Sequence, residues 1–214
     1  MISTVIFDMD GVIIDSEPIH TKIEQQLFRE LNLNVSEEEH STLVGTSDKN
    51  FWQHIHNRYH LAEPVEELMT RKNDRYIRYI EENPDIQPMP GVVEFIKKLY
   101  KDGFDLILAS SAMMKNIEIV LAKFALSKYF RDKVSGATLK HSKPHPEIFQ
   151  IASQRAGTEP EKCLVIEDSK NGVQAAKAAE MKCIGFNSGN QDLSAADIVI
   201  HRFSEVTVRQ IRSM

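Results

Sequence analysis

The sequence predicts an α/β fold, in which a doubly wound, mostly parallel, Rossmann-like sheet carries an inserted α-helical domain. Apolar runs of strand length alternate with helix-length segments whose apolar residues are spaced three and four apart, as in right-handed β-α-β units. The apolar runs are continuous rather than alternating, which fits strands that are buried on both faces. Near the N-terminus a long region with helical periodicity interrupts the alternation.

The expected strands and helices of the core follow from the continuous apolar runs and from the helical spacing of apolar residues. Strands are expected at 5–7, 105–109, 133–137, 163–167, 182–186 and 197–200. Core helices are expected at 114–125, 146–156 and 171–180. Together these elements predict a core domain made of residues 1–14 and 87–214.

The interrupting region, residues 15–86, is predicted to be a separate helical cap domain. Its expected helices span 17–31, 36–43, 50–60 and 64–82. Ser36 followed by Glu39 matches a capping box and supports a helix start. The proline-rich stretch 84–92 is interpreted as the linker that returns the chain to the core.

Composition and the lack of certain segments argue against several classes of protein. Charged residues make up 27% of the chain and hydrophobic ones 42%, and the net charge is −5, which argues against nucleic acid as a partner. We identify no apolar stretch of the roughly 20 residues that a membrane span requires, and no signal peptide. Cys163 and Cys183 each open an apolar run and are predicted to be reduced core residues. We therefore expect a cytoplasmic protein without membrane partners, a monomer with a dimer left open.

Polar residues gather where the expected strands end. They are Asp8 and Asp10, Ser110 and Ser111, Lys143, and Glu167 and Asp168. Each has an ordinary structural explanation as a turn residue, a helix cap or a solvated loop residue. Because ligands of open parallel sheets bind at the carboxyl ends of the strands, their joint occurrence there favours a functional site instead.

This set of side chains suits phosphoryl transfer with a magnesium ion. A carboxylate that attacks a phosphate dianion meets repulsion of about 4 kcal/mol per charge pair at 4 Å, which a cation bound by oxygen ligands removes. The lysine and the serine hydroxyl suit the phosphoryl oxygens, where charge accumulates. Asp10 is placed to exchange a proton with the leaving and entering oxygens.

The motifs resemble those of the haloacid dehalogenase superfamily, in its subclass with a helical cap. They are DMDG at 8–11, LASS at 108–111, KPHP at 143–146 and EDSKNG at 167–172. The resemblance implies that Asp8 is the nucleophile and Asp10 the general acid and base. It implies further catalytic roles for Ser110 and Lys143. The implied Mg²⁺ ligands are Asp8, Asp10, Glu167 and Asp168.

Within the superfamily the chain resembles the β-phosphoglucomutase-like group of phosphatases and mutases. That resemblance implies substrate contacts from the cap, by His20, Gly45, Ser47 and Lys72. Two positions depart from the group. Asp48 stands where the mutase carries a phosphate-gripping arginine, and whether Lys49 replaces that arginine stays open. Glu180 stands where the family usually has glycine, which we interpret as a structural variation.

Three further residues lie beside these motifs and are candidate substrate or phosphate contacts. They are Ser111, Asn116 and Asn171. The expected partner is a small phosphorylated metabolite, with a sugar phosphate favoured.

The prediction is a Mg²⁺-dependent phosphatase acting through an aspartyl phosphate on Asp8. β-Phosphoglucomutase activity is the main alternative, supported by His20 and Lys72, and inorganic pyrophosphatase is a weaker one. A carbon–halogen hydrolase is disfavoured because such relatives lack the second aspartate of DMDG. A receiver domain would be shorter and uncapped, and the full catalytic set disfavours a non-catalytic sugar-phosphate-binding protein.

Overall fold

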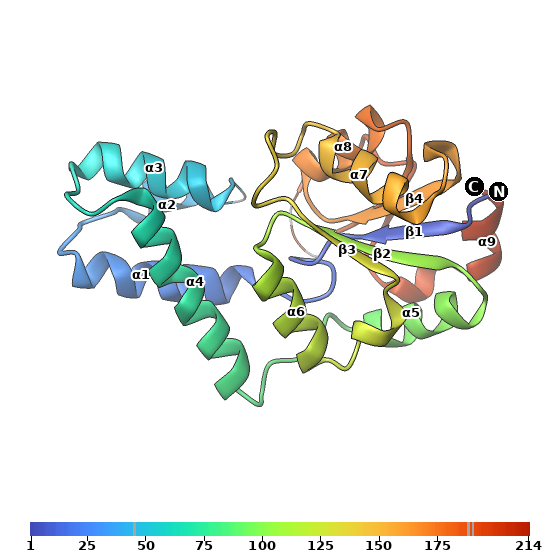
Figure 1. Ribbon diagram of the computed structural model, residues 1–214, viewed down its shortest axis with the longest axis horizontal. Helices are drawn as coiled ribbons and strands as arrows, with labels where there is room; N and C mark the ends of the chain where they lie inside the picture. Colours follow the sequence, from blue (N-terminus) through green and yellow to red (C-terminus); the bar gives the residue numbers. More distant parts are fainter. Residues whose placement is uncertain (45, 188, 190) are drawn as a thin grey trace. The chain divides into compact units, whose positions relative to one another are not determined.

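The chain divides into two compact units in a computed structural model that describes residues 1–44, 46–187, 189 and 191–214. Unit 1 comprises Met1–Asp15 and Asp85–Met214, and unit 2 comprises Ser16–Pro84 (Figure 1). These limits differ by one or two residues from the expected 14/15 and 86/87. Within unit 1, the two chain segments that lead to and from unit 2 pair with each other. Ile14 bridges Pro88, and the Met89 N–H donates to the Ile13 carbonyl at 2.8 Å.

Unit 1 is built on a parallel sheet with strand order β3-β2-β1-β4-β5-β6. The strands are β1 (Thr4–Phe7), β2 (Asp105–Ser110), β3 (Asp132–Ser135), β4 (Cys163–Glu167), β5 (Lys182–Phe186) and β6 (Ile198–Ile200). In register, Phe7 lies opposite Leu108 on one side and Ile166 on the other. The residues after β1, β2 and β4 therefore leave the sheet at the same edge.

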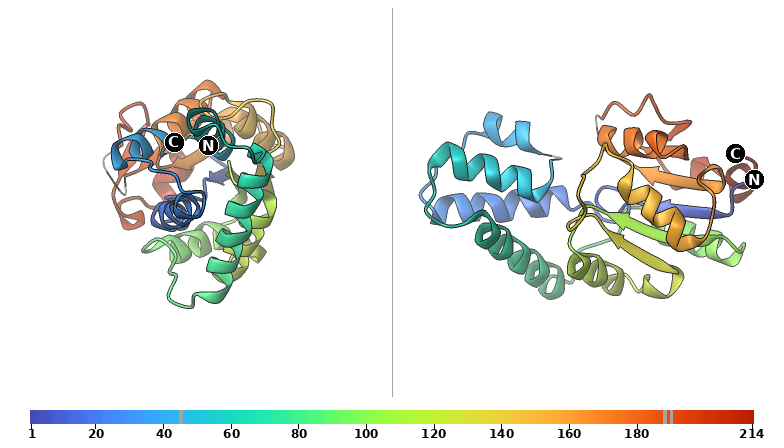
Figure 2. Two further views of the ribbon diagram at one scale, coloured as in Figure 1. Left: turned by 90° about the vertical axis from the view of Figure 1, so that its left-hand side faces the viewer. Right: turned by 45° about the horizontal axis from the view of Figure 1, so that its top comes forward.

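Helices cover both faces of this sheet (Figures 1 and 2). They are α5 (Val92–Lys101), α6 (Met114–Lys123), α7 (Glu147–Ala156), α8 (Lys170–Ala178) and α9 (Val208–Ser213). On one face, apolar residues of α7 and α8 form a buried cluster with β-strand residues such as Ile107 and Val165. On the other, aromatic rings connect β1 to α5 and onward, with Phe7 edge-on to Phe95 at 6.3 Å. Both faces are thus sealed, as the continuous apolar runs predict.

Unit 2 consists of helices in the described part of the chain. They are α1 (Glu17–Glu30), α2 (Glu37–Leu43), α3 (Asp48–Tyr59) and α4 (Val65–Glu82). Phe28, Phe51 and Trp52 are buried and pack ring against ring at its centre. At the start of α2, the Ser36 hydroxyl accepts from the Glu39 N–H at 3.1 Å. The Glu39 carboxylate bonds Tyr59 at 2.7 Å, so the serine half of the expected capping box is present.

The α/β architecture confirms the predicted fold class, and most expected elements recur within a few residues. α5 was absent from the expected set, although its buried residues follow a helical spacing. Glu180 has a positive φ of 62°, a conformation that favours glycine. This backbone requirement explains why a glycine would suit the position.

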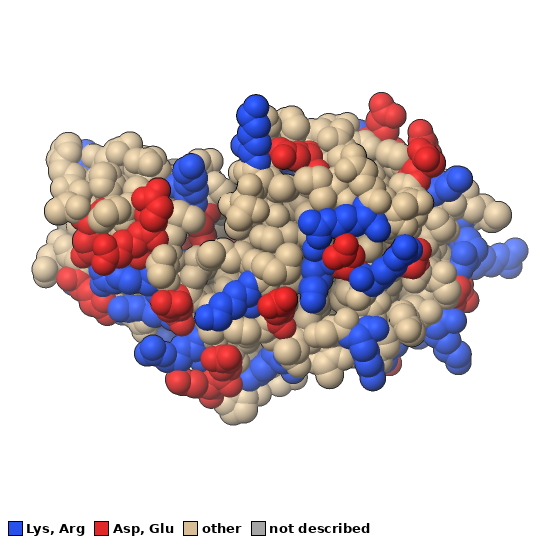
Figure 3. Space-filling view, viewed as in Figure 1, with Lys and Arg blue, Asp and Glu red and all other residues tan. Residues whose placement is uncertain are grey.

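The structure also describes the cysteines, the surface charges and the two termini. Both cysteines are buried and free, and burial raises the pKa of Cys163 to about 12. Among the described helices, none has the length and apolarity needed to cross a membrane. Basic and acidic side chains are interspersed on the face drawn in Figure 3. The termini lie side by side, with the Ile2 N–H bonded to the Arg212 carbonyl at 3.2 Å (Figure 2).

Candidate active site

Asp8 and Asp10 lie in a tight loop directly after the buried strand β1. The Asp8 N–H continues the parallel pairing by donating to the Ile166 carbonyl at 3.0 Å, so the sheet fixes the Asp8 backbone. The Met9 carbonyl accepts from the Ile13 N–H at 2.8 Å and turns the chain back. This turn leaves Asp8 buried and Asp10 half-buried at the strand tip.

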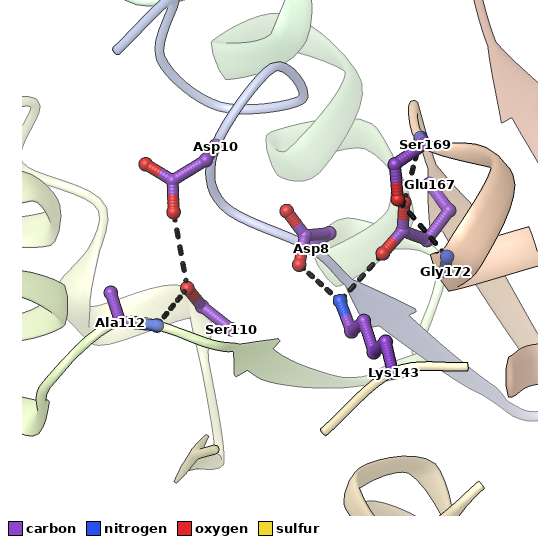
Figure 4. Close-up of polar contacts among 8 residues, drawn as sticks. All are labelled: Asp8, Asp10, Ser110, Ala112, Lys143, Glu167, Ser169 and Gly172. Atoms are coloured by element: carbon purple, nitrogen blue, oxygen red, sulfur yellow. Dashed lines mark hydrogen bonds and ion pairs between the residues drawn. The ribbon is translucent and has the colours of Figure 1, made fainter. Parts of the chain in front are cut away.

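Ser110 ends the neighbouring strand β2 and is hydrogen-bonded to Asp10. Its hydroxyl donates to Asp10 Oδ2 at 3.3 Å and accepts from the Ala112 N–H at 3.0 Å (Figure 4). The Gly136 N–H, after β3, donates to the Ser110 carbonyl at 2.7 Å. The Ala112 N–H therefore orients the hydroxyl toward the loop that carries Asp10, while the bond from Gly136 fixes the Ser110 backbone.

Lys143 joins the ends of β1 and β4 from the loop before α7. Its ammonium donates to Asp8 Oδ1 and Glu167 Oε1, both at 2.5 Å (Figure 4). It also lies over the ring of Phe149 on α7, 5.0 Å from the centroid, which adds a cation–π attraction. Burial by itself lowers the pKa of Lys143, but the charges of the two carboxylates outweigh it and raise the pKa overall. The lysine is thus held as a cation.

Glu167 is buried at the end of β4 and is oriented by the start of α8. Its Oε2 accepts from both the N–H and the hydroxyl of Ser169, each at 2.9 Å. The Ser169 hydroxyl caps α8 by accepting from the Gly172 N–H at 3.0 Å. A Cβ on Gly172 would lie 1.8 Å from Glu167 Oε1. The glycine therefore provides the space in which this carboxylate sits.

The Asp168 carboxylate also packs against a glycine, Gly11, in the loop after β1. A Cβ on Gly11 would lie 1.9 Å from Asp168 Oδ2, and Gly11 has a φ of 77°. Burial raises the pKa of Asp168, and the negative charges of Glu167 and Asp8 raise it further. The pKa of Asp8 is also raised. Burial is the main cause, the charges of Glu167 and Asp10 add to it, and the charge of Lys143 opposes it.

The donor set fits a divalent cation. Four carboxylates, those of Asp8, Asp10, Glu167 and Asp168, interact through their charges, while Lys143 supplies a single positive charge among them. Burial is the main cause of the raised pKa values of Asp8 and Asp168, and the negative charges of the neighbouring carboxylates add to it. Hard cations such as Mg²⁺ prefer carboxylate oxygens and relieve such repulsion.

The structure places the other candidates of unit 1 near the ends of β2 and β4. Ser111 is exposed directly after β2. Asn116 lies in the first turn of α6 and is buried, and Asn171 lies in the first turn of α8 and is exposed. Their proposed substrate contacts stay predictions.

The described candidates of unit 2 lie on α1, on α4 and at the residue that caps α3, and Gly45 lies outside the described residues. His20 is half-buried on α1, with its ring stacked on Tyr76 at 4.7 Å between centroids. Ser47 caps α3, accepting from the Asn50 N–H at 3.3 Å. Lys72 on α4 is 2% exposed and donates to Asp48 Oδ1 at 2.6 Å. The acid that departs from the mutase pattern is therefore the ion-pair partner of the predicted substrate lysine.

Sequence reasoning missed four residues that shape the site. Ser169 and Gly172 orient Glu167, Gly11 makes room for Asp168, and Phe149 supports Lys143. Ser169 lies within the EDSKNG motif and precedes a helix, which is a recognisable cap signal. Nothing in the local sequence marks Phe149, because its role depends on the fold bringing α7 against the lysine.

Comparison with known proteins identifies the family. The model of the haloacid dehalogenase-like hydrolases matches residues 5–186, which include every motif residue described above. The chain belongs to this family. Its six-stranded parallel sheet is the Rossmann-like core that solved members of the family share, so the predicted family and fold class are both confirmed.

Similar haloacid dehalogenase-like proteins include phosphatases and a mutase. The chain is 29% identical over 207 residues to the phosphorylated carbohydrates phosphatase of Thermotoga maritima, covering 94% of this chain and 95% of that one. It is 30% identical over 210 residues to the β-phosphoglucomutase of Bacillus subtilis, covering 95% and 91%. The crystal structure of CbbY from Rhodobacter sphaeroides with phosphate has a TM-score of 0.87 at 25% identity, covering 96% of each chain.

These similarities identify the protein as a phosphoryl-transfer enzyme of the haloacid dehalogenase-like hydrolase family. The prediction of this enzyme class is thereby confirmed. Both curated relatives are named for phosphorylated sugars, and the two reaction types they represent correspond to the two alternatives left open by the sequence.

Proposed function

We propose that this enzyme is a Mg²⁺-dependent phosphatase that hydrolyses a small sugar phosphate through an aspartyl phosphate on Asp8. The observation that carries the proposal is the pairing of two carboxylates with two different partners. Lys143 holds Asp8, while the Ser110 hydroxyl holds Asp10. One acid can thus serve as nucleophile while the other moves a proton.

In the first step, Asp8 attacks phosphorus and forms a phosphorus–oxygen bond as the bond to the sugar oxygen breaks. Because Lys143 engages Oδ1 of Asp8, we assign the attack to Oδ2. Asp10 donates a proton to the departing sugar oxygen, so that an alcohol leaves rather than an alkoxide. Lys143 and the Ser110 hydroxyl stabilise the charge on the phosphoryl oxygens.

In the second step, the deprotonated Asp10 accepts a proton from water, whose oxygen attacks the phosphoryl group. The bond to Asp8 breaks, which regenerates the carboxylate and releases inorganic phosphate. Asp8, Asp10, Glu167 and Asp168 would hold Mg²⁺. When bound, it supplies charge neutralisation between the nucleophile and the phosphate dianion.

The ion pair of unit 2 favours hydrolysis over mutase chemistry. A mutase must bind a second phosphate group, which requires cationic or hydrogen-bonding residues not already neutralised. Lys72 is buried and its charge is paired with Asp48 at 2.6 Å. Of the two residues that support a mutase, Lys72 is therefore not free to bind a second phosphate, and a singly phosphorylated substrate fits better.

The test is a single reaction with Mg²⁺, β-glucose 1-phosphate and a trace of glucose 1,6-bisphosphate. Free phosphate and glucose 6-phosphate are quantified in the same sample, with Asp8→Asn as the inactive control. We expect free phosphate without glucose 6-phosphate. The same assay on a panel of sugar monophosphates and on pyrophosphate then ranks the substrates by kcat/KM.

Three outcomes would count against the proposal. Glucose 6-phosphate without free phosphate would identify a mutase and show that the Asp48–Lys72 pair does not prevent its chemistry. Preference for pyrophosphate over every sugar phosphate would identify the pyrophosphatase alternative. Phosphate release by Asp8→Asn at the rate of the unmodified enzyme would remove the nucleophile assignment.

A further inference from the structure

A second group of metal-ligating side chains lies on the loop that carries Lys143. His141, His145 and Glu147 each offer a ligand atom, and these atoms lie within 4.8 Å of one another. The two imidazole rings are 4.3 Å apart between centroids, at an angle of 51°. No role in the proposed phosphatase reaction accounts for these three side chains.

Two hydrogen bonds from backbone N–H groups to side chains hold residues 141–147 together. Glu147 Oε2 accepts from the His141 N–H at 2.9 Å, which joins the two ends of the segment. His145 Nδ1 accepts from the Glu147 N–H at 3.2 Å, so its Nε2 points elsewhere and is available to a ligand. The loop therefore pays little conformational entropy to bring the three groups to one ion.

The Glu147 carboxylate lies beside two histidines. Among the described residues, no lysine or arginine forms an ion pair with this carboxylate, which is half-buried at the start of α7. A cation would supply the missing charge. His145 is exposed and His141 is half-buried, so an ion from solvent can reach the group.

The ligand types select the kind of ion. Two imidazole nitrogens and one carboxylate oxygen suit Zn²⁺, which takes three protein ligands and a water in open sites. Mg²⁺ prefers oxygen ligands and would stay at the carboxylate cluster around Asp8. The two groups of side chains therefore differ in the metal that each prefers.

We propose that His141, His145 and Glu147 bind Zn²⁺ and that the bound ion inhibits the enzyme. Lys143 lies between the two histidines in the chain, with its ammonium bonded to Asp8 and Glu167. In the proposed reaction this ammonium turns to the phosphoryl oxygens. An ion that joins residues 141 and 145 restrains the segment and opposes that adjustment.

Binding is tested first, in excess Mg²⁺ so that the carboxylate cluster is occupied. Zn²⁺ is titrated against a chromophoric chelator, and Co²⁺ is added separately to record its visible absorption. The variants are His141→Asn and His145→Asn. The control is His60→Asn, since His60 is exposed with a φ of 51°, which asparagine tolerates.

We expect one Zn²⁺ per chain in the unmodified protein and in the control. Each loop variant should bind it more weakly by more than the roughly 10–100-fold that loss of an outer-shell partner costs. Stoichiometric Zn²⁺ should lower Mg²⁺-dependent phosphate release, and the loop variants should resist this inhibition. The activity measurement rests on the proposed function, whereas the binding measurement does not.

Absence of tight Zn²⁺ binding, or binding that both loop variants retain, would overturn the site. Zinc that binds through the histidines but leaves turnover unchanged would overturn the inhibitory role. An enzyme that releases no phosphate even without zinc would instead contradict the proposed function, and the chelator titration would still decide the zinc site.

Discussion

Lys143 is held by carboxylates from two strands, so its position depends on both Asp8 and Glu167. Removing the charge of Asp8 tests whether this residue has a chemical role in addition to anchoring Lys143. Asparagine has nearly the same shape as aspartate and keeps a carbonyl oxygen that can accept from Lys143. An uncharged, similarly shaped side chain should therefore fit.

Asp8→Asn should lower kcat by at least about 10⁴-fold, as expected when a nucleophile is lost. The far-ultraviolet circular dichroism and the melting temperature should stay close to those of the unmodified protein. Asp74→Asn, at an exposed position of α4, serves as the matched control and should keep full activity. A folded Asp8→Asn variant that keeps near-normal kcat would contradict the assignment of Asp8 as the nucleophile.

Gly172→Ala should displace the Glu167 carboxylate, because the added Cβ would lie 1.8 Å from Oε1. Overpacking of this kind costs about 1–3 kcal/mol of folding free energy, and Mg²⁺ affinity should fall as well. Urea unfolding and Mg²⁺ titration of activity measure the two effects. Gly189→Ala is the control, since nothing lies within 4 Å of its Cβ position; equal losses in both variants would exclude the steric explanation.

Glu180→Gly should stabilise the protein by about 1 kcal/mol, because Glu180 adopts a left-handed conformation with φ 62°. The exposed side chain has no catalytic role in the proposal, so kcat should be unchanged. Urea denaturation of both proteins measures the difference in their free energies of unfolding. A destabilised variant would mean that the gain in unfolded-chain entropy outweighs the relief of strain.

Single residues at the strand ends could be predicted because parallel topology alone brings them to one edge. The supporting contacts could not be predicted in the same way. Gly11 and Gly172 make room for particular carboxylate orientations, which depend on side-chain rotamers and on the packing of α8. The Asp48–Lys72 pair likewise joins residues far apart in the chain, and no local pattern marks it.

At the scale of helices, the Asp48–Lys72 pair links the first turn of α3 to the buried face of α4. Its two ends differ in exposure, since the Lys72 side chain is 2% exposed and that of Asp48 is 35% exposed. Removing the charge of Asp48 and removing the charge of Lys72 should therefore change the folding free energy by different amounts. A charge left behind in the interior costs more than one left near water.

Asp48→Asn should destabilise the fold by about 1–3 kcal/mol, less than the roughly 3–5 kcal/mol of a fully buried pair. Lys72→Met should cost less, and the double variant should recover part of the Asp48→Asn loss. Chemical denaturation of all three variants gives this comparison. The reverse order, with Lys72→Met the more damaging, would show that packing of the lysine stem matters more than its charge.

The helices of unit 2 were predictable because each carries apolar residues at helical spacing, and α5 shows the same signal. Val92, Phe95, Ile96 and Leu99 are buried at intervals of three and four, which is the spacing of a helix that packs along one face. Helix ends were less predictable. α3 begins at Asp48, two residues before its expected start, because the Ser47 hydroxyl caps it, whereas α4 begins within one residue of its expected start.

For the whole molecule, Mg²⁺ should stabilise unit 1 because it relieves repulsion among four carboxylates. At a concentration of 100 times Kd the gain is about 2.7 kcal/mol, which raises Tm by roughly 5–10 °C in a protein of this size. Asp168→Asn should abolish most of this shift, while Asp74→Asn should keep it. Differential scanning fluorimetry with and without Mg²⁺ measures the shift; an unchanged response in Asp168→Asn would exclude Asp168 as a ligand.

The pairing of Ile13 and Ile14 with Pro88 and Met89 has a consequence for how such enzymes diversify. Because the segment that leads into unit 2 and the segment that leads out of it are hydrogen-bonded to each other, the two ends of the insertion are held at neighbouring points of unit 1. A different insertion with similarly spaced ends could be grafted there without rearranging β1 or the nucleophile. The insertion and the core can then vary in sequence independently of each other.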